Sequence, residues 1–223
     1  MQGDQVAGTT SDVVIAGARG LAGLHGPRWC DPSWKQLDVL TMPLVDEESA
    51  HGMGELARMA ADTFLQTLGP RLSADDQQTF DAFPKAIPDF LLARPERFAL
   101  LHGDYRLDNL LLHPDGGVTV VDWQTLTVGL PARDLAYWVT TSLSPGERRR
   151  AEGEAVAAYH AVLGVSGYDL ATCEEDYRAG QLHTLLIVAL GWAFTTQTER
   201  GGDMMTVMAQ RACAASRDLG VLA

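Results

Sequence analysis

The sequence predicts a mainly α-helical protein with a small β-hairpin inserted near its middle. Apolar residues recur at helical spacing along most of the chain, for example Val14, Ala18 and Leu21. The stretch 98–121 differs, because short apolar runs replace that periodicity and the turn-forming residues 114–117 separate the last two runs. With 223 residues, 46% of them hydrophobic, the chain has the size and composition of a folded protein that buries its own core.

Helices are expected on both sides of this β region. Thr10 or Ser11 is a candidate N-cap for the first helix, and Ser73 with Asp76 three residues later resembles a capping box. Glycine and proline clusters mark where helices end. The expected helices cover Ser11–His25, Met53–Leu68, a segment from Ser73 that Pro84 and Pro88 interrupt and that resumes through Phe90–Leu92, Asp134–Leu143, Glu147–Leu163, Glu174–Thr198 and Met204–Leu219.

A glycine-rich stretch inside the first helix could instead be taken for a phosphate-binding loop. Gly17, Gly20 and Gly23 follow the short apolar run Val13–Ile15, as such loops follow a strand. Their spacing is GxxGxxG rather than GxGxxG, and the helical apolar stripe continues through them, which favours the helix. Because no linker or repeat divides the sequence, a single domain over residues 1–223 is expected.

Charge and cysteine content argue against several classes of protein. The net charge of -12 argues against nucleic-acid binding, which needs clustered Lys and Arg, but permits a cationic or metal-bridged small molecule. Cys30, Cys173 and Cys213 are widely spaced, which predicts reduced thiols rather than disulfides or a zinc site. The N-terminus lacks a signal-peptide pattern, and no apolar run reaches the roughly 18 residues of a membrane span. A soluble cytoplasmic protein without membrane association is therefore expected.

The β region brings polar residues toward one place. Strands are expected over Phe98–Leu101, Leu110–His113 and Val118–Val121, the last two forming a hairpin. Counting residues from the turn puts Asn109 and Asp122 opposite each other at the open end of this hairpin. His102 and Asp104 enter the same end from the loop after the first strand. Two carboxylates and an amide oxygen form a set of hard oxygen ligands that suits Mg²⁺ rather than zinc.

The motif around these residues is specific. His102–Asn109 reads H-G-D-x-x-x-x-N, and an apolar hairpin then leads to V-D-W at Val121–Trp123. This pattern resembles the aminoglycoside phosphotransferase and choline kinase-like family, which is related to the protein kinases. Gly129–Ala136 is similar to the family's segment after the metal-binding Asp. Tyr177-Arg178 and Thr198–Gly201 resemble the C-terminal helices of its ecdysteroid-kinase-like branch.

The resemblance implies an ATP-dependent transfer of a phosphoryl group to a hydroxyl group of a small molecule, with ATP and Mg²⁺ as cofactors. It makes Asp104 the catalytic base or the group that orients the hydroxyl. Asn109 and Asp122 become the Mg²⁺ ligands and thereby the cofactor-binding residues. His102 would brace the loop by hydrogen bonds rather than react, and Asp134 would anchor a helix near the site.

The same resemblance implies an ATP-binding lobe with a phosphate-covering loop and a strand lysine. The only lysines are Lys35, after a Pro turn, and Lys85, between Pro84 and Pro88, and neither lies in a strand-like run. The chain is therefore expected to correspond to the C-terminal lobe of the protein-kinase-like fold, with the N-terminal lobe absent, as in a truncated kinase. An exposed interlobe face would be apolar and would favour a homo-oligomer.

Two other functions remain open from the sequence. A non-catalytic kinase remnant that binds a metabolite or a partner would explain the missing lysine and glycine loop. A metal-dependent phosphatase could use the same carboxylates, but such sites recruit several His ligands around two metals, and only His102 is near enough here. The identity of the acceptor does not follow from the fold.

Overall fold

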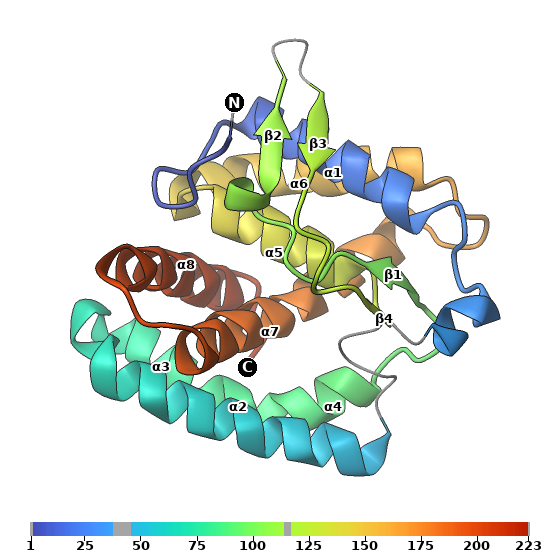
Figure 1. Ribbon diagram of the computed structural model, residues 1–223. Coiled ribbons are helices and arrows are strands. Elements are labelled where there is room, and N and C mark those ends of the chain that lie inside the picture. Colours follow the sequence, from blue (N-terminus) through green and yellow to red (C-terminus); the bar gives the residue numbers. More distant parts are fainter. Residues whose placement is uncertain (1, 38–45, 114–116, 223) are drawn as a thin grey trace. The chain divides into compact units, whose positions relative to one another are not determined.

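A computed structural model describes residues 2–37, 46–113 and 117–222 (Figure 1). The chain divides into two compact units, one formed by residues 1–44 and 94–180 and the other by residues 45–93 and 181–223. Helix α7 (Leu170–Phe194) begins in the first unit and ends in the second. Helices dominate both units and the sheets are small and antiparallel, which confirms the predicted mainly α architecture.

The first unit contains the helices that surround the β region. Helix α6 starts with the capping box of Ser144 and Glu147 and ends at Gly164, which adopts the left-handed conformation with a φ of 65°. The helical bounds in this unit are α1 Ser11–His25, η1 Pro32–Gln36, η4 Leu107–Asn109, α5 Ala132–Ser142 and α6 Pro145–Leu163. Helix α1 has the predicted bounds, so the glycines in it belong to a helix and not to a phosphate-binding loop.

A glycine in α1 allows the core of this unit to close. A Cβ atom at Gly17 would lie 2.4 Å from the Trp138 ring of α5, so no larger residue fits there without a shift. The Trp138 side chain is fully buried, and its Nε1–H donates to the Val14 carbonyl at 2.8 Å. Tyr105, from the loop after β1, donates its hydroxyl to the Gly17 carbonyl at 3.0 Å. The loop that carries the candidate site is thus fixed to α1.

Two small sheets flank that loop. Strand β1 (Ala99–Leu101) pairs antiparallel with β4 (Thr127–Gly129), and β2 (Leu110–Leu112) pairs antiparallel with β3 (Val118–Val120). The hairpin of β2 and β3 lies beside α1 (Figure 1). The sequence predicted β1 and the hairpin within one residue, but not β4, whose three residues are too few to show a period of their own.

The hairpin register corrects the predicted pairing of Asn109 with Asp122. Val121 N–H donates to the Asn109 carbonyl at 3.0 Å, so Asn109 pairs with Val121 and Asp122 lies one position beyond. The cause is Gly117, which belongs to the ladder because its carbonyl accepts from His113 N–H at 2.9 Å. The connection is therefore one residue shorter than the predicted four-residue turn, and its residues 114–116 lie outside the described chain.

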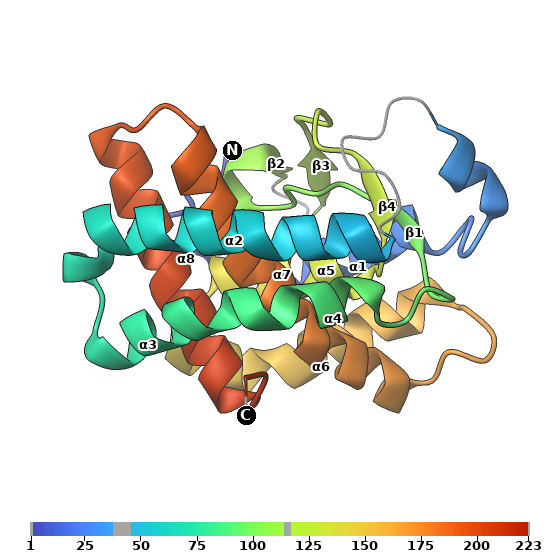
Figure 2. The same ribbon diagram turned by 90° about the horizontal axis from the view of Figure 1, so that it is seen from below.

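The second unit is built from helices alone within the described residues. Its bounds are α2 Glu47–Thr67, η2 Gly69–Arg71, α3 Ala74–Ala82, η3 Phe83–Ala86, α4 Ile87–Leu92, the end of α7, and α8 Glu199–Asp218. Helix α4 runs alongside α2 (Figure 2). Phe64, Phe80 and Phe83 are fully buried in this unit. The ring centroid of Phe80 lies 4.5 Å from that of Phe64 and 5.3 Å from that of Phe83. The predicted interruption at Pro84 is confirmed, since η3 separates α3 from α4. The interruption predicted at Pro88 is wrong, because Pro88 lies in the first turn of α4, where proline is tolerated.

Two further findings concern the cysteines and the length of the helices. Cys30, Cys173 and Cys213 are free thiols. Among the described residues, no helix is long and apolar enough to cross a membrane. Before Ala99 the described chain holds helices and one isolated bridge, between Gln2 and Leu111.

Candidate phosphotransfer site

The loop after β1 is anchored by a buried carboxylate. Asp134, in the first turn of α5, accepts the backbone N–H of His102 on Oδ2 at 2.7 Å and that of Gly103 on Oδ1 at 3.1 Å. Asp134 is fully buried, and His25 Nε2 lies 3.5 Å from its Oδ2. The Nδ1 atom of His25 in turn forms a hydrogen bond with the Tyr159 hydroxyl at 2.8 Å. The predicted anchoring role of Asp134 is therefore seen directly, although it holds the loop as well as the helix.

The charge state of Asp134 follows from these contacts. Burial alone would raise the pKa of Asp134, but the contact with His25 and the backbone N–H of His102 outweigh burial and lower the pKa below its ordinary value. Asp134 is therefore ionised, and an ionised carboxylate makes stronger hydrogen bonds to N–H groups than a neutral one.

Gly103 is required by the loop conformation. Its φ of 81° lies in the left-handed region, and a Cβ atom there would approach the Thr125 carbonyl oxygen to 2.2 Å. Thr125 also donates its hydroxyl to the His102 carbonyl at 2.8 Å, which closes the loop against the segment before β4.

The change Gly103→Ala is expected to destabilise the protein by about 2–4 kcal/mol, because it adds left-handed strain and a clash with a backbone oxygen. Urea unfolding of the variant measures this loss. Gly153→Ala is the matched control, since a Cβ atom at Gly153 in α6 meets nothing within 4 Å. Equal stability of the two variants would contradict the role assigned to Gly103.

His102 braces the loop, as predicted. Its side chain is fully buried, Nδ1 accepts the Asp104 backbone N–H at 3.2 Å, and Nε2 forms a hydrogen bond with the Val121 carbonyl at 3.1 Å. Its ring also lies 4.8 Å from the ring of Trp123. His102 thus connects the residue before Asp122 to the residue that bears the candidate catalytic carboxylate.

The Asp104 carboxylate is held by three side chains. Arg106 Nε donates to both of its oxygens at 3.0 Å. The Tyr137 hydroxyl donates to Oδ1 at 2.9 Å, and Asn109 Nδ2 donates to Oδ2 at 2.8 Å. Arg106 also reaches Asp108 through Nη1 at 3.0 Å. Asp104 is therefore held in one orientation.

Asn109 and Asp122 offer the oxygen ligands that a divalent cation needs. Asn109 uses Nδ2 for its hydrogen bonds to Asp104, which leaves Oδ1 as the acceptor of the amide, with no hydrogen bond from another described residue. Asp122 is exposed, and no other described residue forms a hydrogen bond or ion pair with its carboxylate. Its φ of 65° is a left-handed conformation that a non-glycine residue adopts at a cost. This donor set fits Mg²⁺.

The comparisons with known proteins agree with this geometry. A family model described as the phosphotransferase enzyme family (APH) matches residues 19–175, which include every residue of the site. The chain belongs to the phosphotransferase enzyme family. Membership confirms the resemblance noted in the motif.

Solved structures show the same fold. The chain resembles a Plasmodium vivax ethanolamine kinase with a TM-score of 0.54 at 15% identity, over 94% of this chain and 61% of the kinase. It also resembles a Ralstonia eutropha JMP134 protein assigned as an aminoglycoside phosphotransferase, with a TM-score of 0.53 at 19% identity, over 96% of this chain and 69% of that one.

The curated relatives of this chain are much longer proteins. Mouse acyl-CoA dehydrogenase family member 10 is 48% identical over 48 residues, which are 21% of this chain and 4% of the relative. Human acyl-CoA dehydrogenase family member 11 is 38% identical over 64 residues, which are 28% of this chain and 8% of the relative. The matches thus cover less than a tenth of either relative.

Sequence reasoning missed two residues of the site, Arg106 and Tyr137. Arg106 lies two positions after Asp104, a spacing at which side chains of an extended segment share a side. Tyr137 lies three positions after Asp134 on α5, so both share one face of that helix. The anchoring role predicted for Asp134 was the signal that could have placed Tyr137 near the loop.

Proposed function

We propose that this chain carries the catalytic site of an ATP-dependent kinase that phosphorylates a hydroxyl group of a small molecule, with Asp104, Asn109 and Asp122 as the working residues. The proposal rests on one observation. The Asn109 amide lies between the Asp104 carboxylate and the end of the hairpin, where Asp122 follows the residue paired with Asn109. Family membership adds support for phosphoryl transfer.

In this proposal Asp104 receives the hydroxyl of the acceptor and orients it for attack. Both carboxylate oxygens already accept two hydrogen bonds, so an incoming hydroxyl must replace one donor. Arg106 is the donor that leaves most easily, because its side chain is 19% exposed and because its guanidinium keeps an ion pair with Asp108 when it releases Asp104. Tyr137 and Asn109 are buried and keep Asp104 oriented during the exchange.

Asn109 Oδ1 and the Asp122 carboxylate would hold Mg²⁺, which when bound neutralises the charge of the nucleotide phosphates. The left-handed backbone at Asp122 fixes where its carboxylate can reach. The cost of that conformation is compatible with a functional requirement at this residue.

Titration calorimetry of the chain with ATP, with and without Mg²⁺, tests the proposal. Binding is expected to depend on Mg²⁺, and Asp122→Ala is expected to remove that dependence, because the variant lacks the only charged ligand of the pair. Glu174→Gln, which removes an exposed carboxylate in α7, serves as the control. Absence of ATP binding would contradict the proposal and favour the non-catalytic binding role.

A further inference from the structure

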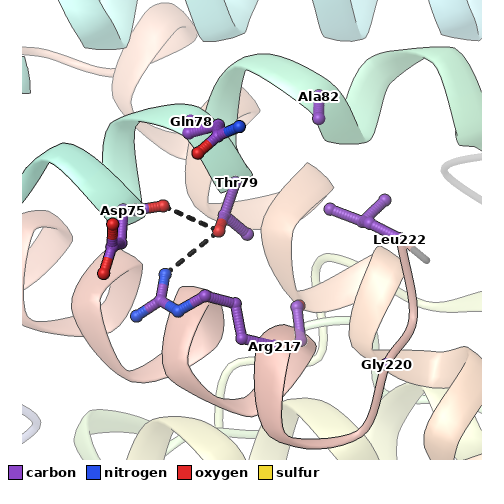
Figure 3. A pocket seen from close by; sticks show the side chains of 8 residues that line it. Asp75, Gln78, Thr79, Ala82, Arg217, Gly220 and Leu222 are labelled. Atoms are coloured by element: carbon purple, nitrogen blue, oxygen red, sulfur yellow. Dashed lines mark hydrogen bonds between the residues drawn. The ribbon is translucent and has the colours of Figure 1, made fainter.

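A second candidate binding site lies in the unit formed by residues 45–93 and 181–223, outside the phosphotransfer site. A cavity of about 360 Å³ opens between α3 and the end of α8, within the size range of small-molecule sites. One wall is a single face of α3, and the other is the end of α8 with the chain that follows it. Its lining residues are Asp75, Gln78, Thr79, Ala82, Ser216, Arg217, Gly220 and Leu222 (Figure 3).

The cavity contains a buried polar group with no partner. Ser216 is 1% exposed, and its Oγ forms no hydrogen bond with any described residue. Leaving a buried hydroxyl unpaired costs about 1–3 kcal/mol. A ligand that supplies a hydrogen-bond partner for Ser216 would recover this cost.

The lining also carries charges of both signs. Arg217 Nη1 donates to the Thr79 hydroxyl at 3.0 Å and Nη2 to Asp76 Oδ1 at 2.7 Å. Since a guanidinium has five N–H groups, these two bonds leave Arg217 with further donors. The Asp75 carboxylate forms no ion pair or hydrogen bond with a described residue, and it lies at the opposite end of the cavity from Leu222 and Ala82 in Figure 3.

We propose that this cavity binds a free α-amino acid with a short apolar side chain. Its ammonium group pairs with Asp75, its carboxylate accepts from Arg217 and Ser216, and its side chain contacts Ala82 and Leu222. The ion pair with Asp76 already compensates the charge of Arg217, so a simple amine would pair with Asp75 but would leave the Ser216 hydroxyl and the remaining Arg217 donors without an acceptor. A simple acid would accept from those donors but would meet the negative charge of Asp75, so the zwitterion fits the lining better than either ion.

Nuclear magnetic resonance titration of the isotope-labelled chain tests this proposal independently of phosphotransfer. L-leucine is the probe, and 3-methylbutylamine and 4-methylpentanoate are matched ligands that lack its carboxylate or its ammonium group. Saturable shifts of the Thr79 and Leu222 amides are expected with leucine, and at least tenfold weaker binding with either analogue. Equal binding of an analogue, or no saturable shift at about 10 mM leucine, overturns the proposal.

Variants of the lining residues distinguish binding in this cavity from unspecific binding of leucine elsewhere on the chain. Asp75→Asn is expected to weaken leucine binding at least tenfold and Ser216→Ala at least threefold. Asp89→Asn, at an exposed position of α4, removes an equal charge away from the cavity and is expected to leave binding unchanged. Asp75 is exposed, so its replacement preserves the fold, as circular dichroism would show. Equal affinity of Asp75→Asn and Asp89→Asn for leucine overturns the proposal.

Discussion

Replacing Asp104 by Asn is expected to lower the rate of phosphoryl transfer by about 10²–10⁴-fold, the range found when a positioned acid–base group is removed. The Asn side chain has nearly the same shape as Asp, but one of its two carboxylate oxygens becomes an NH₂ group. That group would face Arg106 Nε and either Tyr137 or Asn109, all of which are donors in the protein. The variant therefore loses both the acceptor for the hydroxyl and the contacts that orient it.

The measurement is transfer of labelled phosphate from ATP to a panel of small-molecule alcohols, together with calorimetric binding of ATP and Mg²⁺. Binding is expected to survive in Asp104→Asn while transfer is lost, because Asp104 is not assigned to the metal. Glu174→Gln is again the control for the removal of one carboxylate. A variant that retained the full transfer rate would show that Asp104 does not orient the acceptor.

Tyr137→Phe removes one hydrogen bond to the Asp104 carboxylate and leaves the carboxylate itself in place. The Tyr137 hydroxyl stays protonated, because burial and the negative charge of Asp104 raise its pKa well above the ordinary value. It is thus a permanent hydrogen-bond donor to Asp104. Removing it is expected to reduce kcat by about tenfold with little change in KM for ATP, since the nucleotide does not depend on this bond. An unchanged kcat would mean that Arg106 and Asn109 orient Asp104 without it.

The helices could be predicted from the sequence because the information is local. Helix α1 has the predicted bounds Ser11–His25, since its apolar stripe has a period that only a helix explains and Gly26 follows it. The hairpin was predicted for the same reason, but its register was wrong by one residue. The length of this turn depends on whether Gly117 pairs with His113 or belongs to the turn, and the amino-acid composition of the turn does not reveal which of the two occurs.

The site could be predicted only in part, because some of its contacts join distant residues. The motif placed Asp104, Asn109 and Asp122 together, since they belong to one hairpin and the loop before it. Tyr137 reaches Asp104 across 33 positions, and its hydrogen bond depends on how α5 packs. The absence of an ATP-binding lobe and the formation of a homo-oligomer stay predictions, because the fold of this chain tests neither of them.

Replacing the buried Asp134 by Asn is expected to destabilise the protein about as strongly as Gly103→Ala. Its carboxylate accepts two backbone N–H groups of the catalytic loop, and an Asn side chain offers one oxygen while placing an NH₂ group against the second N–H. An unsatisfied buried donor and the loss of a charge-assisted bond together cost about 2–4 kcal/mol. The same change would release His102 and Gly103 and with them the position of Asp104.

The effect of Asp134→Asn is expected to depend on pH in a definite direction. Because the pKa of Asp134 is lowered in the folded protein from the ordinary 3.8, its charge stabilises the fold above that pH, and this contribution disappears as the pH falls through the folded-state pKa. The difference in unfolding free energy between the natural protein and Asp134→Asn should therefore be constant near neutrality and shrink below about pH 4. Urea unfolding at several pH values measures it, with Asp12→Asn at the exposed start of α1 as the control. A difference that stayed the same down to about pH 2 would mean that the carboxylate acts through its shape and not through its charge.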